Sequence, residues 1–151
     1  MTMFCLILVN VEASAETNSD QALSSIETET EQNEIPEICY QVNKEDFYYY
    51  SENLNAFFND IRFIPIVTDD RIRAYKIDHI KKNSIISHYA PEVGVEITHT
   101  NNKPVKEIKN LITAISLINK GKSLELSIIN NVGQIVNYKY LFNPESSCSD
   151  T

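Results

Sequence analysis

The chain has 151 residues, of which 42% are hydrophobic, with 13 basic and 21 acidic side chains. This length and apolar share fit one compact domain with a tail, and they exclude a chain that is disordered throughout. The net charge of −8 argues against nucleic acid or an anionic membrane as the partner. No apolar run reaches the roughly 18 residues needed to span a bilayer, so we predict no transmembrane span in this chain.

The N-terminal residues have the layout of a secretory signal peptide. A short apolar run over residues 4–9 is followed by a small-residue site that ends at Ala15. No Lys or Arg precedes the run, and Asn10 and Glu12 shorten it. We predict a signal peptide over residues 1–15; the alternative is an ordinary hydrophobic N-terminus or a fragment of a longer anchor.

An acidic segment follows. From Glu16 to Glu37 the chain carries seven acidic side chains and no basic one. A stretch rich in Ser, Thr, Gln and Glu cannot bury enough apolar surface to offset the entropy lost on ordering. We therefore predict a disordered linker over residues 16–37, with an acidic arm that docks a basic partner as the alternative. Residues 143–151 are predicted to be a flexible tail.

The folded part is predicted to begin with a helix. Apolar side chains at helical spacing from Phe47 to Ile61 form one continuous stripe. This indicates a helix packed on a sheet, although a Tyr-rich stripe is also compatible with a ligand platform. A strand over residues 63–67 follows, where Pro65 indicates a sheet edge or strand start. A turn at residues 68–71 leads to a second strand over residues 72–80.

The second half of the domain alternates between helices and strands. A short helix is predicted over residues 84–89 and a strand over residues 95–98. The clearest helix runs over residues 108–118, with its apolar side chains on one face and Gly121 at its end. Two strands over residues 124–128 and 135–142 form a closing hairpin. This order predicts an α+β domain over residues 38–142, with a partly open antiparallel sheet.

Short motifs in chain order carry a resemblance to a known family. They are residues 61–65, Arg71 with residues 75–77, residues 84–86, Gly94 with Ile97, and residues 101–105. Together they resemble the PDZ domain of the bacterial type II secretion protein C (general secretion pathway protein C) family, over about residues 54–142. Val95 stands where that family usually has Asp, and Asn102 where it has Gly. The resemblance implies a PDZ-like fold.

The resemblance also implies a peptide-binding groove between a strand and the long helix, where an extended peptide adds to a strand edge. The implied groove residues are Arg73, Ala74, Tyr75, Lys76 and Ile77 on the strand, and Ile108, Leu111, Ile112 and Ile115 on the helix. Asp70 and Ala74 replace two glycines of the loop that, in peptide-binding PDZ domains, binds a partner's C-terminal carboxylate. Capture of a free C-terminus is therefore expected to be weakened, whereas strand addition is not.

The sequence gives little sign of catalysis. His79, His88 and His99 lie too far apart in the chain for a local zinc motif. The chain has only three glycines, and no nucleophile elbow or phosphate-binding loop is present. We predict a protein that is not an enzyme, with no catalytic residues, no metal site and no cofactor.

The sequence thus predicts a PDZ-type adaptor of the periplasm, or one associated with the inner membrane, that binds a secretion-apparatus component or an exported protein. Full-length relatives also carry a membrane anchor and a secretin-binding domain, for which we expect no room here. A detached regulatory module that presents peptides to a periplasmic protease, or a degenerate domain with no groove ligand, are the alternatives. Cys39 and Cys148 flank the domain, and they either pair in an oxidising periplasm or remain free thiols.

Overall fold

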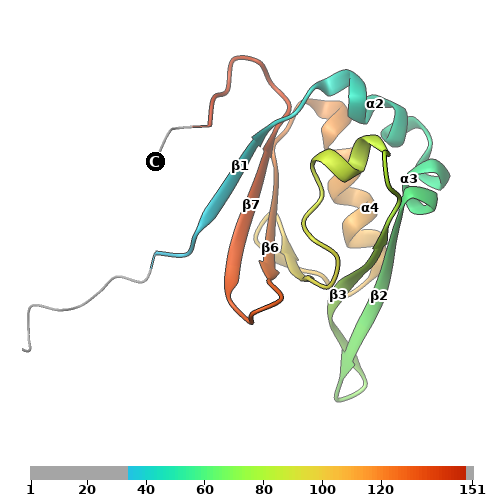
Figure 1. Ribbon diagram of the computed structural model, residues 1–151, viewed down its shortest axis with the longest axis vertical. Helices are drawn as coiled ribbons and strands as arrows, with labels where there is room; N and C mark the ends of the chain where they lie inside the picture. Colours follow the sequence, from blue (N-terminus) through green and yellow to red (C-terminus); the bar gives the residue numbers. More distant parts are fainter. Residues whose placement is uncertain (1–33, 149–151) are drawn as a thin grey trace, which may run out of the picture. The chain divides into compact units, whose positions relative to one another are not determined.

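The computed structural model describes residues 34–148, apart from the side chain of Asn119 (Figure 1). The predicted signal peptide and the predicted linker up to residue 33 lie outside the described residues, as does the end of the predicted tail from residue 149. The compact unit begins at Ile35, so its ordered part starts slightly before the predicted boundary at residue 38.

One sheet organises the domain. Its strands follow the order β1-β7-β6-β4-β3-β2, and β5 pairs with β4 beside this path. The strands are β1 (Glu37–Gln41), β2 (Ile61–Thr68), β3 (Arg71–Ile80), β4 (Glu96–Thr100), β5 (Lys103–Pro104), β6 (Leu124–Ile129) and β7 (Ile135–Leu141). All pairings are antiparallel except that of β1 with β7, which is parallel. The predicted α+β class with an open sheet is confirmed.

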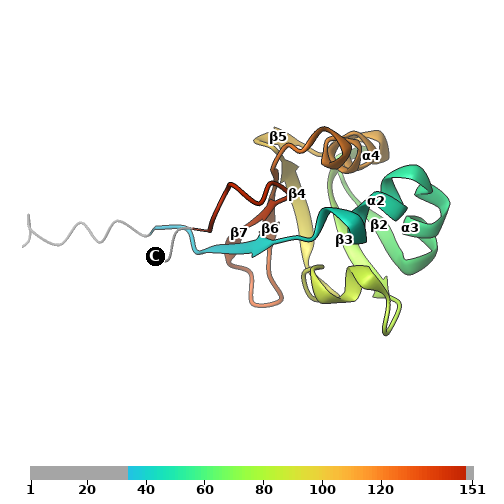
Figure 2. The same ribbon diagram turned by 90° about the horizontal axis from the view of Figure 1, so that it is seen from above.

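Helical segments cover the sheet and its upper end. They are α2 (Lys44–Glu52), α3 (Leu54–Asp60), the 3-10 turn η1 (Ile85–His88), α4 (Ile108–Ser116) and the 3-10 turn η2 (Ile118–Lys120). Helix α4 lies over one face of the sheet, and α3 lies beside the start of β2 (Figures 1 and 2). The apolar face of α4 buries Leu111, Ala114 and Ile115.

The prediction of a single helix from Phe47 to Ile61 is wrong, because the helix is interrupted at Asn53. The backbone N–H of Asn53 donates to the Tyr49 carbonyl and ends α2, while its side chain accepts from the Ala56 N–H and begins α3. Asparagine favours such caps because its short side chain competes for nearby backbone groups. The two helices still share one apolar side, with Phe47, Tyr50 and Phe57 buried.

The termini of the described region are joined. A disulfide connects Cys39 in β1 to Cys148, with a Cα–Cα distance of 5.7 Å. Residues 143–148, predicted as part of a flexible tail, are thereby tied to the edge strand β1. The side chain of Gln41 also donates to the carbonyl of Asn143 at 3.1 Å. The bond and this contact hold the C-terminal segment beside the start of the domain.

Candidate functional site

The open edge of the sheet next to the helices belongs to β2. Among the described residues β2 pairs only with β3, whereas β3 lies between β2 and β4. The predicted groove residues Arg73, Ala74, Tyr75, Lys76 and Ile77 all lie in β3. Tyr75 and Lys76 pair with β4 as well as with β2, so they offer no open backbone edge, whereas the side chain of Ile77 lines an apolar cavity together with residues of β2 and α4. The edge strand indicated by Pro65 is confirmed, because Pro65 lies in β2.

The hydrogen bonds of β3 show which backbone groups of β2 face outward. Ile77 donates its N–H to the Val95 carbonyl at 3.0 Å and accepts from the Gly94 N–H at 2.8 Å, so its polar groups face away from β2. Ile77 is the register partner of Phe63. In an antiparallel pair the two opposed residues either exchange both hydrogen bonds or turn both away. The N–H and C=O of Phe63 therefore face the open edge.

Two neighbours of Phe63 restrict what this edge can offer. Pro65 has the same orientation, two residues further along β2, and contributes a carbonyl but no N–H. The N–H of Ile61 is already used, because it donates to the Phe57 carbonyl at the end of α3. Over residues 61–65 the edge thus offers one free donor, the Phe63 N–H, and the acceptors of Phe63 and Pro65.

An apolar cavity lies inside this edge, in the core that β2 and α4 share with the other strands and helices. We call it the β2–α4 groove, and define it by Ile61 and Phe63 on β2 and Leu111 and Ile115 on α4. These side chains line a cavity of about 60 Å³, whose lining includes no charged residue.

Two of the four predicted helix residues, Leu111 and Ile115, therefore line the groove. The other two, Ile108 and Ile112, are not part of the cavity lining. Ile108 is 38% exposed and Ile112 is half-buried, so both lie on the outer flank of α4.

Helix α3 supports the groove from the side. The ring of Phe63 stacks on Phe57, with ring centres 6.1 Å apart, and meets the edge of Phe58 at 6.3 Å. Phe57 also lines the cavity. These contacts fix the Phe63 side chain, and hence the strand whose backbone faces outward.

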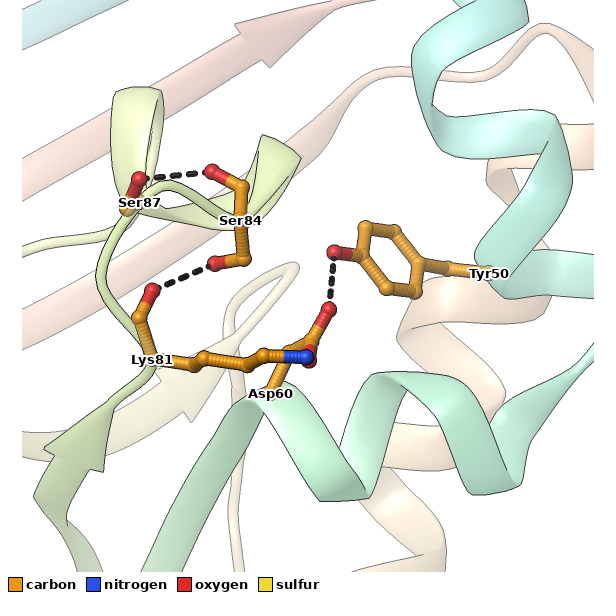
Figure 3. Close-up of polar contacts among 5 residues, drawn as sticks. All are labelled: Tyr50, Asp60, Lys81, Ser84 and Ser87. Atoms are coloured by element: carbon orange, nitrogen blue, oxygen red, sulfur yellow. Dashed lines mark hydrogen bonds and ion pairs between the residues drawn. The ribbon is translucent and has the colours of Figure 1, made fainter.

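A polar cluster lies where β2 begins (Figure 3). The Tyr50 hydroxyl donates to Asp60 Oδ2 at 2.7 Å, and Lys81 Nζ lies 3.1 Å from Asp60 Oδ1. The Lys81 N–H donates to the Asp60 carbonyl at 2.7 Å. The Ser84 hydroxyl in turn donates to the Lys81 carbonyl at 2.8 Å. The cluster joins α2, the α3–β2 junction and the end of β3.

The electrostatics of the cluster keep Asp60 charged. The hydrogen bond from Tyr50, supported by Lys81, lowers the pKa of Asp60 below its ordinary value. Burial, together with the hydrogen bond to Asp60, raises the pKa of Tyr50 to about 12. At neutral pH the cluster therefore contains a carboxylate, a neutral phenol and an ammonium whose charge is already paired.

The described residues contain no group of His, Cys, Asp and Glu side chains arranged to hold a metal ion. His79, His88 and His99 are all exposed and lie on different elements or their ends. No helix among residues 34–148 is long and apolar enough to cross a membrane.

No family model and no curated protein matches the chain. Solved structures similar to it include the PDZ domain of EpsC from Vibrio cholerae, with a TM-score of 0.47 and 16% identity over 66% of this chain and 98% of that one. A shorter fragment of the same domain has a TM-score of 0.43 and 16% identity, and covers 57% of this chain and 98% of its own.

A third similar structure is the PDZ domain of the pullulanase C protein of the Klebsiella pneumoniae type II secretion system, solved with a fatty acid. It has a TM-score of 0.42 and 10% identity over 57% of this chain and 88% of that one. Because these TM-scores lie below 0.5, the contacts of the β2 edge, and not the likeness, support the proposed function.

The sequence did not point to Phe63 or to the cluster of Tyr50, Asp60 and Lys81 as parts of the site. Pro65 was the one available signal, since a proline within a strand pattern marks an edge. The turn predicted at residues 68–71 is confirmed: Asp69 and Asp70 form the two-residue turn between β2 and β3, with φ of 50° and 58°. Such turns require positive φ at both positions, which Asp adopts more readily than most residues.

Proposed function

We propose that the PDZ-like domain is a non-enzymatic adaptor that binds an extended segment of a partner protein along the β2 edge. The observation that carries this proposal is that the Phe63 N–H and C=O face outward on the side of β2 that no other strand pairs with among the described residues. In strand addition, backbone hydrogen bonds supply affinity and neighbouring pockets supply side-chain specificity. The β2–α4 groove lies where such a pocket is needed.

The partner we propose is a component of the type II secretion apparatus or a protein exported by it, and the place of action is the periplasm. The ordered motifs that resemble the protein C family support this choice. The disulfide between Cys39 and Cys148 also supports it, since structural disulfides persist in oxidising compartments such as the periplasm.

Site-specific photo-crosslinking in the native host tests both parts of the proposal. One variant carries a photoreactive residue at Ile64, which is 43% exposed on β2; the control carries it at Val132, which is 76% exposed on the β6–β7 turn. We expect a crosslink to a secretion component or exported protein from position 64 and not from position 132. Both side chains are exposed, so a difference between them reports a contact at the β2 edge.

The other outcomes have distinct meanings. A crosslink from position 64 to a protease would identify a regulatory module of proteolysis and contradict the secretion role. Identical crosslinks from both positions would contradict binding at the β2 edge. The absence of crosslinks from either position, in cells where this protein itself has been exported, would contradict it as well.

A further inference from the structure

We propose that the β2 edge accepts an internal segment of the partner chain and not its C-terminal end. This inference rests on the proposed function and specifies the class of ligand. An extended segment can be held by its backbone, by its side chains or by the charge at its terminus. The groups at the two ends of β2 decide among these possibilities.

At the start of β2, the backbone has no donor for a terminal carboxylate. Helix α3 ends at Asp60 and β2 begins at Ile61, so no loop with free N–H groups lies between them. The N–H of Ile61 donates to the Phe57 carbonyl, and that of Lys81 donates to the Asp60 carbonyl. Carboxylates are bound by clusters of free N–H groups or by cations, and these N–H groups are already occupied.

The side chains at this end also give no net attraction to a second carboxylate. Asp60 is ionised, and both Tyr50 and Lys81 already contact it, at 2.7 and 3.1 Å. A partner's terminal carboxylate would therefore meet an ion pair without net charge, and the exposed ammonium of Lys81 would contribute little as a second partner.

The far end of β2 gives no better site for a segment that runs in the opposite direction. Asp69 and Asp70 form the turn there. Arg73 is paired with Glu96 at 2.9 Å. Arg71 is exposed, and an ion pair with an exposed arginine contributes little. Neither end of the edge is thus built to recognise a chain terminus.

The middle of the edge does fit an internal segment. A residue opposite Phe63 can exchange both backbone hydrogen bonds with it, and a residue opposite Pro65 can donate its N–H to the proline carbonyl. The cavity of about 60 Å³ has the volume of roughly two water molecules. The structure therefore favours a small apolar side chain at the position that faces the β2–α4 groove.

Two display libraries of random decapeptides test this inference on the wild-type protein. In one library each peptide ends in a free carboxylate, and in the other the same peptides are flanked on both sides by Gly-Ser linkers. The selected peptides are then made as free acids and as C-terminal amides, and their Kd values are measured by fluorescence anisotropy. We expect binders from the flanked library, with acid and amide Kd values within twofold of each other.

Amide hydrogen exchange provides an internal control for the location. Binding should slow exchange of the Phe63 N–H, which faces the edge, and leave that of Ile61 unchanged, because Ile61 already donates to Phe57. Free acids that bind at least tenfold more tightly than their amides, with Phe63 protected, would overturn the internal-segment inference and leave strand addition standing. Failure of both libraries, or binding without protection of Phe63, would contradict the proposed function itself.

Discussion

Asp60 contributes both to the stability of the domain and to the properties of its β2 edge. Its carboxylate accepts from Tyr50 and pairs with Lys81, and its carbonyl accepts from the Lys81 backbone. These contacts hold the first residue of β2 in place, so that Phe63 presents its backbone to the edge. The same contacts keep the carboxylate charged at the position that an incoming terminus would approach. One side chain thus positions the β2 edge and, in the proposed function, restricts what that edge accepts.

This arrangement predicts the behaviour of Tyr50→Phe, which removes only the hydroxyl that donates to Asp60. A hydrogen bond to a charged group typically contributes about 1.5–3 kcal/mol, so we expect the free energy of unfolding at pH 7 to fall by roughly 1–3 kcal/mol. Urea unfolding measures this loss. Tyr49→Phe is the control, because Tyr49 is 54% exposed, and its change should stay within about 0.5 kcal/mol.

The difference between wild type and Tyr50→Phe should depend on pH at both extremes. The pKa of Tyr50 is raised from 10.0 to about 12 in the folded state, so its contribution is complete below pH 10 and is lost as the pH rises towards 12. The pKa of Asp60 is lowered from 3.8, so its contribution is complete above that value and is lost at lower pH. A difference that remained constant up to pH 11.5 would contradict the assigned hydrogen bond.

At the scale of elements, Asn53 decides how α2 and α3 join. It ends one helix with its backbone and begins the next with its side chain, so Phe57 and Phe58 reach the ring of Phe63. Without this break, a continuous helix would carry the following residues along a different axis. The break therefore places α3, which supports the β2–α4 groove, beside Phe63 of β2.

Asn53→Ala should destabilise the domain by about 0.5–2 kcal/mol, because it removes the side-chain acceptor for the Ala56 N–H. Asn55→Ala is the matched control: Asn55 is exposed within α3, where Ala is the better helix former. Its free energy of unfolding should be unchanged or slightly higher. Equal losses in the two variants, measured by urea unfolding, would show that the cap does not matter.

The helices and strands could be predicted from the sequence better than the pairing of the strands in the sheet. Apolar periodicity identified α4, the strands β2 and β3 and the β6–β7 hairpin, because each pattern is local. It missed the break at Asn53, since the apolar stripe continues across the cap. The family resemblance implied groove residues over 73–77 on β3, and alternation within a strand does not reveal whether the strand is central or at an edge. That distinction depends on pairing between distant segments, for which Pro65 was the only local sign.

At the scale of the whole described domain, the two ends of the sheet have different roles. Strand β2 lies at one end with its edge open, and β1 lies at the other end, where the disulfide ties it to the C-terminal segment. The bond joins residues 109 positions apart, so it encloses almost the whole domain. It therefore restricts the unfolded chain strongly, while it lies at the end of the sheet away from the proposed site.

Cys148→Ser should lower stability without changing the binding edge. The loop-entropy model assigns about 4–5 kcal/mol to a loop of this length, and we expect a loss of about 2–5 kcal/mol in the free energy of unfolding. Wild-type protein in reductant should fall to the value of the variant, whereas the variant should not respond to reductant. Because β1 and β2 are at opposite ends of the strand order, the Kd of a peptide selected on the wild-type protein should remain within twofold at a temperature where both proteins are folded. A large rise in this Kd would mean that the disulfide shapes the β2 edge through the sheet, and that the two ends do not act independently.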